Sequence, residues 1–138
     1  DLLKIFNKSL NLNKNIKKDF GLDVIAIYKR SANILNSESK SKLEIVGSAD
    51  PGLFKNDYEK NLYKKIHAIR KYFSSIGRDE DYDESLKTLS SAKIEVNEFF
   101  DNVIVNDQEE IIKKNRLELL KMLCKSFDNY FNFSKIEA

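Results

Sequence analysis

The sequence has few of the residues that build reactive or metal-binding sites. Its 138 residues include one histidine, one cysteine, one proline, four glycines and no tryptophan. A single His and a single Cys cannot readily form a zinc cluster, or a Cys–His pair with a third orienting group. Four scattered glycines make no Gly-rich phosphate loop. We therefore expect no catalytic residue, metal site or cofactor in this chain by itself.

Two further absences bear on location. Cys124 stands alone, which excludes an intrachain disulfide and suits a reducing compartment. The longest apolar runs are only a few residues and no signal peptide is recognisable, so we expect a cytoplasmic protein without membrane contact. The chain opens at Asp1, without Met and inside a helical pattern, so we expect residues 1–138 to be one domain of a longer protein.

Charge is abundant and unevenly distributed, although the net charge is only +2. Residues 1–30 carry seven Lys or Arg and three acids, and residues 55–78 carry seven and two, giving +4 and +5. Residues 79–110 carry eleven acids and two Lys, giving −9. A polyanion would be steered to the basic segments. The alternative is that these charges are solvated helix faces, since the sequence pI of about 8.5 is moderate.

The strongest helical pattern lies near the end of the chain, from Asp107 to about Phe131. It has a broad apolar stripe, and Asn106 or Asp107 can cap its start with Glu109 or Glu110 at N3. We expect the rest of the chain to pack on this helix. The stripe consists of Leu117, Leu119, Leu120, Leu123, Phe127 and Tyr130.

Further helices are predicted over residues 1–10, 16–35, 56–76 and 81–103, the last with a kink near Lys93. Asn56 with Glu59, and Asp81 with Glu84, fit N-cap and N3 positions, and Gly77 fits a helix end. Residues 36–50 are predicted to form a loop, and residues 103–105 are too short for a convincing strand. The fold class expected is all-α, a compact bundle of five or six helices.

Two sets of polar side chains recur at helical spacing. Lys60, Lys64, His67 and Lys71 form a basic ridge opposite an apolar stripe, with Arg70 beside it. Lys29, Arg30 and Asn33 share one polar edge of an earlier helix. Unpaired RNA bases are recognised by Lys, Arg, Asn and aromatic side chains, so both sets suit RNA as well as water.

Several short motifs follow one another along the chain. Residues 99–105 fit Phe-Phe-Asp-x-Val-x-Val, and after an acidic turn Asn115, Arg116, Leu117, Leu119 and Leu120 fit Asn-Arg-Leu-x-Leu-Leu. This order of motifs resembles the C-terminal end of the bacterial glycyl-tRNA synthetase beta subunit. Upstream, Lys29, Arg30, Asn33 and Ile34 match a Lys-Arg-x-x-Asn-Ile motif, and Leu53, Phe54, Glu59 and Leu62 fit a Leu-Phe-x-Glu region. The family often has Pro before Phe-Phe, where this chain has Ile94-Glu95.

The resemblance implies a DALR-like anticodon-binding domain at the C-terminus of the longer chain. Such a domain would grip the anticodon arm of glycine tRNA, while the alpha subunit of a heterotetramer uses ATP and magnesium to activate and transfer glycine. Its partners would be glycine tRNA, the alpha subunit and the remainder of beta, with no DNA and no membrane. The alternative is a structural bundle that docks within the synthetase without touching tRNA. An enzyme with an unrecognised carboxylate site is a weaker third hypothesis.

For several candidate tRNA-binding residues, the alternative is a structural role within the bundle. Lys29, Arg30 and Asn33 suit phosphate and base-edge contacts, or helix packing with Asn33 bonded to a nearby loop. Arg116 lies one turn before Leu120 on the buried stripe, so we favour an ion pair with Asp101 over tRNA contact for it. The complete set of candidate tRNA-binding residues is Lys29, Arg30, Asn33, Lys60, Lys64, Arg70, Lys71, Asn115 and Arg116.

Overall fold

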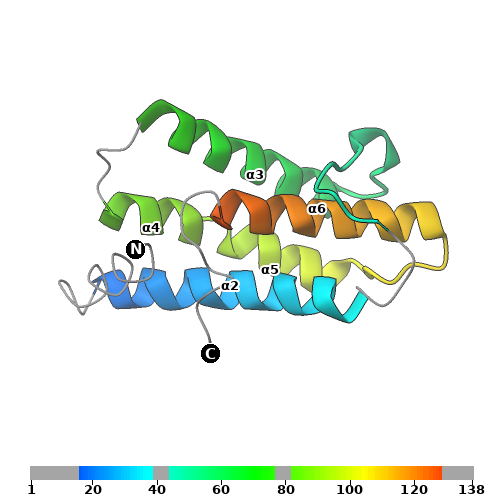
Figure 1. Cartoon of the computed structure of the whole chain (residues 1–138), viewed down its shortest axis with the longest axis horizontal. Helices are drawn as coiled ribbons and strands as arrows, with labels where there is room; N and C mark the ends of the chain where they lie inside the picture. The colour runs from blue at the N-terminus through cyan, green and yellow to red at the C-terminus, as the bar shows by residue number, and fades with distance from the viewer. Residues whose placement is uncertain (1–15, 39–43, 77–81, 129–138) are drawn as a thin grey trace.

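A computed structural model describes residues 16–38, 44–76 and 82–128 and shows helices packed side by side (Figure 1). In chain order these residues form α2 (Ile16–Glu38), the 3-10 helix η1 (Pro51–Leu53), α3 (Asp57–Ile76), α4 (Tyr82–Ser90), α5 (Lys93–Asn102) and α6 (Glu110–Asp128). Across these three ranges there is no strand, and the all-α fold class is confirmed. The helix expected over residues 1–10, and the signals at Gly77 and Asp81, lie outside the described residues.

Helix α6 lies between α2 and α3. It packs against α2 on one side and α3 on the other, and runs between them in Figure 1. Most of its residues are buried, including Leu117, Leu119, Leu120, Leu123 and Phe127 of the predicted stripe. The expectation that the other elements pack on this helix is therefore confirmed for α2 and α3, whereas α4 and α5 pack mainly on α2 and α3.

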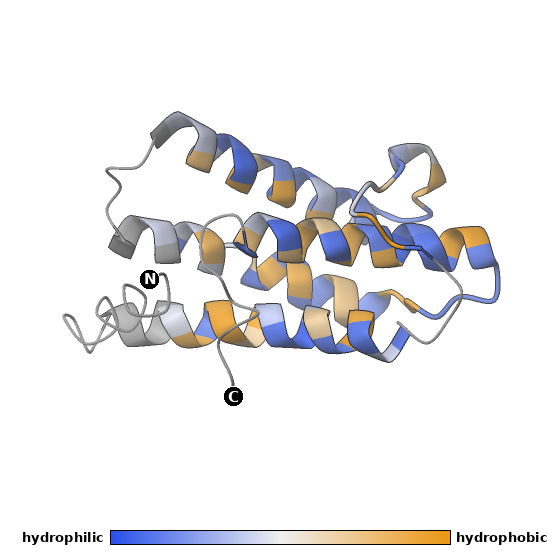
Figure 2. Ribbon diagram, in the orientation of Figure 1, coloured by the Kyte–Doolittle hydropathy of each residue, from blue (hydrophilic) through white to orange (hydrophobic). Residues whose placement is uncertain are grey.

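The core is built from apolar side chains of all five described α-helices. Figure 2 shows hydrophobic and hydrophilic stretches alternating along the helices, as expected for helices that pack on one another and also face water. The fully buried side chains with the largest volume are Leu62, Ile66 and Ile69 of α3, Leu89 of α4, Phe99 of α5, and Leu117, Leu119, Leu120 and Phe127 of α6. None of the described helices combines the length and apolarity that a membrane span requires.

Helix α3 begins as its sequence predicts. Asn56 Oδ1 accepts a hydrogen bond from the Glu59 N–H at 3.1 Å, and Glu59 Oε1 accepts one from the Lys55 N–H at 2.9 Å. Each side chain satisfies a backbone donor that would otherwise lack a partner at the helix start. This local exchange fixes the entry of α3.

Helix α6 begins later than predicted, at Glu110 rather than Asp107. Asp107 Oδ1 accepts the N–H of Glu109 at 2.9 Å, and Asp107 Oδ2 lies 3.3 Å from Arg116 Nη1. An Asp side chain that bonds the backbone two residues on stabilises a turn and not a helix. Asp107 therefore forms the turn that precedes α6.

Two other boundaries also differ from prediction. The segment predicted as one kinked helix over 81–103 is two helices, α4 and α5, separated at Ser91 and Ala92. Ser90 Oγ and Ser91 Oγ donate to the carbonyls of Lys87 and Thr88, and such bonds compete with helix continuation. Residues 36–38, predicted as loop, extend α2 to Glu38.

Candidate nucleic-acid interface

The basic ridge predicted on α3 is present at the surface. Lys60, Lys64, His67 and Lys71 are all exposed, and we call them the α3 ridge. No described residue forms an ion pair with Lys60, Lys64 or Lys71. The ring of His67 packs edge-on against Tyr63, with 4.4 Å between centroids. The ridge thus offers ammonium groups to solvent along an outer surface of the bundle.

Arg70, which the sequence places beside this ridge, is directed toward α6. Its Nε donates to Ser126 Oγ at 2.7 Å and its Nη2 donates to the Met122 carbonyl at 3.3 Å. Both partners lie on α6, and Ser126 is buried. Arg70 therefore fastens α3 to α6 and is not one of the exposed cations of the ridge.

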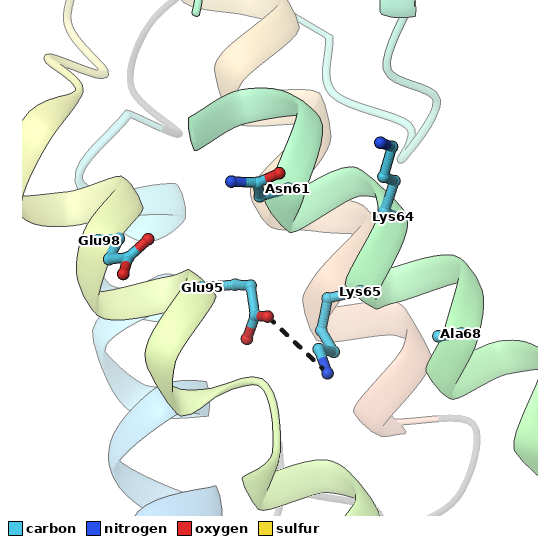
Figure 3. Close-up of a pocket in the computed structure, with 6 residues that line it drawn as sticks. All are labelled: Asn61, Lys64, Lys65, Ala68, Glu95 and Glu98. Carbon is cyan, nitrogen blue, oxygen red and sulfur yellow. Dashed lines mark ion pairs between the residues drawn. The ribbon is translucent and has the colours of Figure 1, made fainter. Parts of the chain in front are cut away.

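A groove lies between α3 and α5, next to the ridge. Its volume is about 330 Å³, and we call it the α3–α5 groove. Figure 3 shows its α3 and α5 side chains on opposite walls, with Lys65 facing Glu95. Lys65 Nζ and Glu95 Oε2 are 3.8 Å apart. The groove is lined by Asn61, Lys64, Lys65, Ala68, Glu95 and Glu98.

The second predicted set lies on α2, and α5 separates it from α3. Arg30 and Asn33 are exposed, whereas Lys29 is half-buried. The Arg30 guanidinium carbon lies 4.3 Å from the centre of the Phe100 ring on α5, a cation–π contact. Figure 1 shows α5 between α2 and α3. The structure therefore does not merge the two sets, but places them on either side of one helix.

Asn115 is buried and not available to RNA in this structure. Its Oδ1 accepts the Asp50 N–H at 2.7 Å, and its Nδ2 donates to the Asp50 carbonyl at 3.0 Å. The side chain thus binds both backbone groups of one residue in the segment that precedes η1. Its role in this structure is to hold that segment on α6.

Arg116 is 5% exposed, and its role is structural. The predicted ion pair with Asp101 is wrong. Its Nη2 lies 3.4 Å from Glu59 Oε1, and its Nη1 donates to the Ile104 carbonyl at 2.7 Å and approaches Asp107. Asp101 is exposed on α5 and is not a partner of Arg116. The Arg116 cation therefore joins α6 to the start of α3 and to the α5–α6 connection.

Glu118 is a site residue that sequence reasoning missed. It is 4% exposed, and its Oε1 accepts the backbone N–H groups of Val46, Gly47 and Ser48. Gly47 has φ +91°, a conformation that side chains with a Cβ rarely adopt. In the sequence, Glu118 stands between Leu117 and Leu119 of the apolar stripe. A charged residue at a buried position needs a hydrogen-bonding partner, so this position could have been recognised from the sequence.

Cys124 is buried, and Tyr28 and Asp128 beside it are half-buried. The Tyr28 hydroxyl donates to Asp128 Oδ2 at 3.1 Å. Burial, and then Asp128, raise the pKa of the Cys124 thiol from 9.0 to about 12, and the same causes raise the pKa of Tyr28 above its ordinary value. A thiol that stays protonated is a weak nucleophile, so Cys124 is a packing residue.

The free energy of unfolding should fall as the pH rises from about 9 towards 12, because folded Cys124 holds its proton after the unfolded thiol has lost it. The stability that this thiol contributes is complete below the unfolded pKa. Its loss should not exceed about 1.4 kcal/mol per pH unit. Urea unfolding of the wild type and Cys124→Ala across this pH range tests the prediction. The free energy of unfolding of the variant should fall less steeply with pH. Equal slopes would contradict the prediction.

Comparison with known proteins adds independent information. Residues 24–138 match the family model described as the DALR anticodon binding domain. The chain is 35% identical over 125 residues to the glycine–tRNA ligase beta subunit of Rickettsia typhi, covering 91% of this chain and 18% of that protein. It is 35% identical over 119 residues to that of Rickettsia africae, covering 86% and 17%. It is 33% identical over 126 residues to that of Rickettsia felis, covering 91% of this chain and 18% of that protein. The chain thus spans less than a fifth of the length of these relatives.

Proposed function

This chain belongs to the DALR anticodon binding domain family, and from that premise we propose that it grips the anticodon arm of glycine tRNA as part of a glycine–tRNA ligase beta subunit. The observation that carries the proposal is the α3 ridge, whose Lys60, Lys64 and Lys71 are exposed and free of ion pairs to the described residues. Ammonium groups in such a row attract successive phosphates of a nucleic-acid backbone and release its counterions.

In this proposal the chemistry takes place elsewhere in the synthetase. The alpha subunit, with ATP and magnesium, activates and transfers glycine, and this chain positions the tRNA in the cytoplasm. The described residues contain no cluster of three or more metal-ligating side chains. The remainder of beta and the alpha subunit are its proposed protein partners.

Lys29, Arg30 and Asn33 supply a second proposed contact, across α5 from the ridge. Packed helices lie about 8–10 Å apart, so an RNA hairpin resting on α5 can reach both α2 and α3. Arg30 is exposed while it stacks on Phe100, which leaves one face of its guanidinium plane for an unpaired base. In the proposal, the ridge attracts phosphates and Arg30 supplies a stacking surface.

The proposal is tested by measuring binding to glycine tRNA and to the same tRNA with a changed anticodon, each at two salt concentrations. We expect affinity that falls with salt and weakens when the anticodon is changed. Equal binding to both tRNAs would reduce the function to nonspecific attraction. Absence of binding at low salt would favour the alternative, a bundle that docks within the synthetase without touching tRNA.

The double variant Lys60→Ala/Lys71→Ala should reduce the slope of log affinity against log salt by roughly 1.5, because two phosphate contacts are lost. Its matched control is Lys87→Ala/Lys114→Ala, which removes two exposed lysines from α4 and α6. The control has the same net charge and should keep a slope close to that of the wild type. Equal slopes for the two double variants would show that the ridge is not the phosphate-binding surface.

A further inference from the structure

Two isoleucines are more than half exposed where α5 passes into α6. Ile104 lies in the α5–α6 connection and is 74% exposed, and Ile111 lies in the first turn of α6 and is 57% exposed. Figure 1 shows this connection at one end of the bundle. Three exposed carboxylates, those of Asp101, Glu109 and Glu110, belong to the same stretch. We call these five residues the α5–α6 edge.

The backbone of the connection is fixed by the core and holds Ile104 outward. Val103 is extended, with φ −122° and ψ 129°, and is buried, and Val105 packs partly buried against the core. Successive side chains of an extended segment point to opposite sides, so the two valines leave Ile104 facing water. Arg116 Nη1 donates to the Ile104 carbonyl at 2.7 Å. The exposure of Ile104 is therefore a property of an ordered backbone.

Arg116 also ties the connection to the start of α6. Its Nη1 meets both the Ile104 carbonyl and Asp107 Oδ2, which is 3.3 Å away. Side chains of a helix point towards its N-terminus, so the Arg116 guanidinium lies beside the first turn, which carries Ile111. One buried cation thus holds both isoleucines at the same end of the bundle.

The charge of the edge favours a protein partner over a nucleic acid. Residues 94–112 carry six acids and no Lys or Arg. No described residue forms an ion pair with Asp101, Glu109 or Glu110. Exposed carboxylates repel phosphates and attract Lys and Arg. The edge therefore suits a basic protein surface with a recess for aliphatic side chains.

The small size of the edge indicates how that surface is supplied. A stable complex between separate proteins buries about 800 Å² on each partner, which two isoleucines and three carboxylates do not provide. A surface that belongs to the same chain needs less area, because the covalent link gives it a high effective concentration. The chain spans less than a fifth of the length of its beta-subunit relatives, so most of such a subunit lies outside it.

We propose that the α5–α6 edge docks on a basic, aliphatic-lined surface in the remainder of the glycine–tRNA ligase beta subunit. This inference rests on the proposed function, which makes the chain part of that subunit. Docking at this end of the bundle fixes the orientation of the domain and leaves the α3 ridge free for tRNA.

Photo-crosslinking of the whole beta subunit, without the alpha subunit, tests the inference. A benzophenone amino acid replaces Ile104 in one preparation and, as the matched control, Lys60 of the α3 ridge in another, because both sites are exposed. From position 104 we expect about fivefold or more crosslinks to parts of the subunit outside this chain, and the crosslinked segment should contain Lys or Arg. Equal yields from both positions, or a crosslinked segment without Lys or Arg, would overturn the inference.

A second substitution is then combined with the crosslinking amino acid at position 104. Ile111→Ser should lower the yield about threefold or more, because less apolar surface would leave water on docking. Leu22→Ser is the matched control, since Leu22 is 54% exposed on α2, and it should leave the yield unchanged. A yield that does not respond to Ile111→Ser would also overturn the inference.

Other occupants of the edge would give different products. Crosslinks only to a second copy of the beta subunit, or only after the alpha subunit is added, would overturn the assignment to the remainder of beta. Binding of glycine tRNA is measured on the same preparations. Absence of the crosslink with tRNA binding retained would overturn this inference alone. The expected crosslink without tRNA binding would support the inference and overturn the proposed grip on tRNA.

Discussion

Replacing Arg116 with alanine should lower the free energy of unfolding by about 3–5 kcal/mol, because the Glu59 carboxylate would stay buried without its cation. Glu59 is fully buried, and the Arg116 side chain is 6% exposed. The substitution also removes the Arg116 N–H group that donates to the Ile104 carbonyl. That hydrogen bond holds the α5–α6 connection on α6. Urea unfolding followed by circular dichroism measures the loss.

A double variant separates the value of this ion pair from the cost of breaking it. Glu59→Gln keeps an oxygen for the Lys55 N–H, and Arg116→Met fills much of the same space. Together they should cost less than Arg116→Ala, because no charge is left buried and unpaired. Glu59 Oε2 and Arg116 Nε already lack hydrogen-bond partners among the described residues, so the native pair is incompletely satisfied.

The control for this experiment is Lys93→Ala. Lys93 forms an ion pair with Asp23 at 3.2 Å, but both side chains are substantially exposed. Exposed pairs contribute at most about 1 kcal/mol. A loss of that size for Arg116→Ala would contradict the assignment of Arg116 as the charged junction between α3, α6 and the α5–α6 connection.

Glu118→Ala should destabilise the protein by about 3 kcal/mol, since it deprives three backbone N–H groups of one charged acceptor. The effect should be concentrated where residues 46–48 lie on α6. Amide hydrogen exchange is the direct measurement, and Val46, Gly47 and Ser48 should lose protection first. Unchanged protection at these amides would contradict the prediction.

Two companion variants sharpen the Glu118 experiment. Glu118→Gln keeps an oxygen acceptor without the charge, so it should cost about 1 kcal/mol. Lys125 also binds this segment, donating from Nζ to the Val46 carbonyl at 2.6 Å, but it is exposed. Lys125→Ala should therefore cost no more than about 0.5 kcal/mol. A cost that decreases from Glu118→Ala to Glu118→Gln to Lys125→Ala would identify the buried carboxylate as the dominant contact.

Patterns within one helix were predictable because their causes are local. Residues three and four apart share a helix face, so the apolar stripes of α3 and α6 and the exposed Lys60, Lys64 and Lys71 follow from spacing alone. The Asn56–Glu59 cap is equally local, since its members are three residues apart. A helical domain with a basic ridge on one helix was therefore predictable without coordinates.

Competing local bonds made the prediction wrong at two helix boundaries. Asp107 fits an N-cap by type, yet its two oxygens bind Glu109 and Arg116 in the turn before α6. Ser91 is compatible with a helix interior by spacing, but its hydroxyl bonds the Thr88 carbonyl at the end of α4. Spacing favours the helical conformation and does not weigh these side-chain bonds against it.

The sequence by itself determined the fold class, the Asn56–Glu59 cap of α3 and the apolar stripes that face the core, because these depend on neighbours within a turn. Only the tertiary structure decided how the polar side chains were used. Arg70 meets α6 across 52–56 residues, Arg116 meets Glu59 across 57, and Glu118 meets its three amides across 70–72. A charged side chain bonds whichever complementary group the packing brings near it. The packing therefore decided that Lys64 is exposed beside the α3–α5 groove, whereas Arg70 on the same helix bonds to α6.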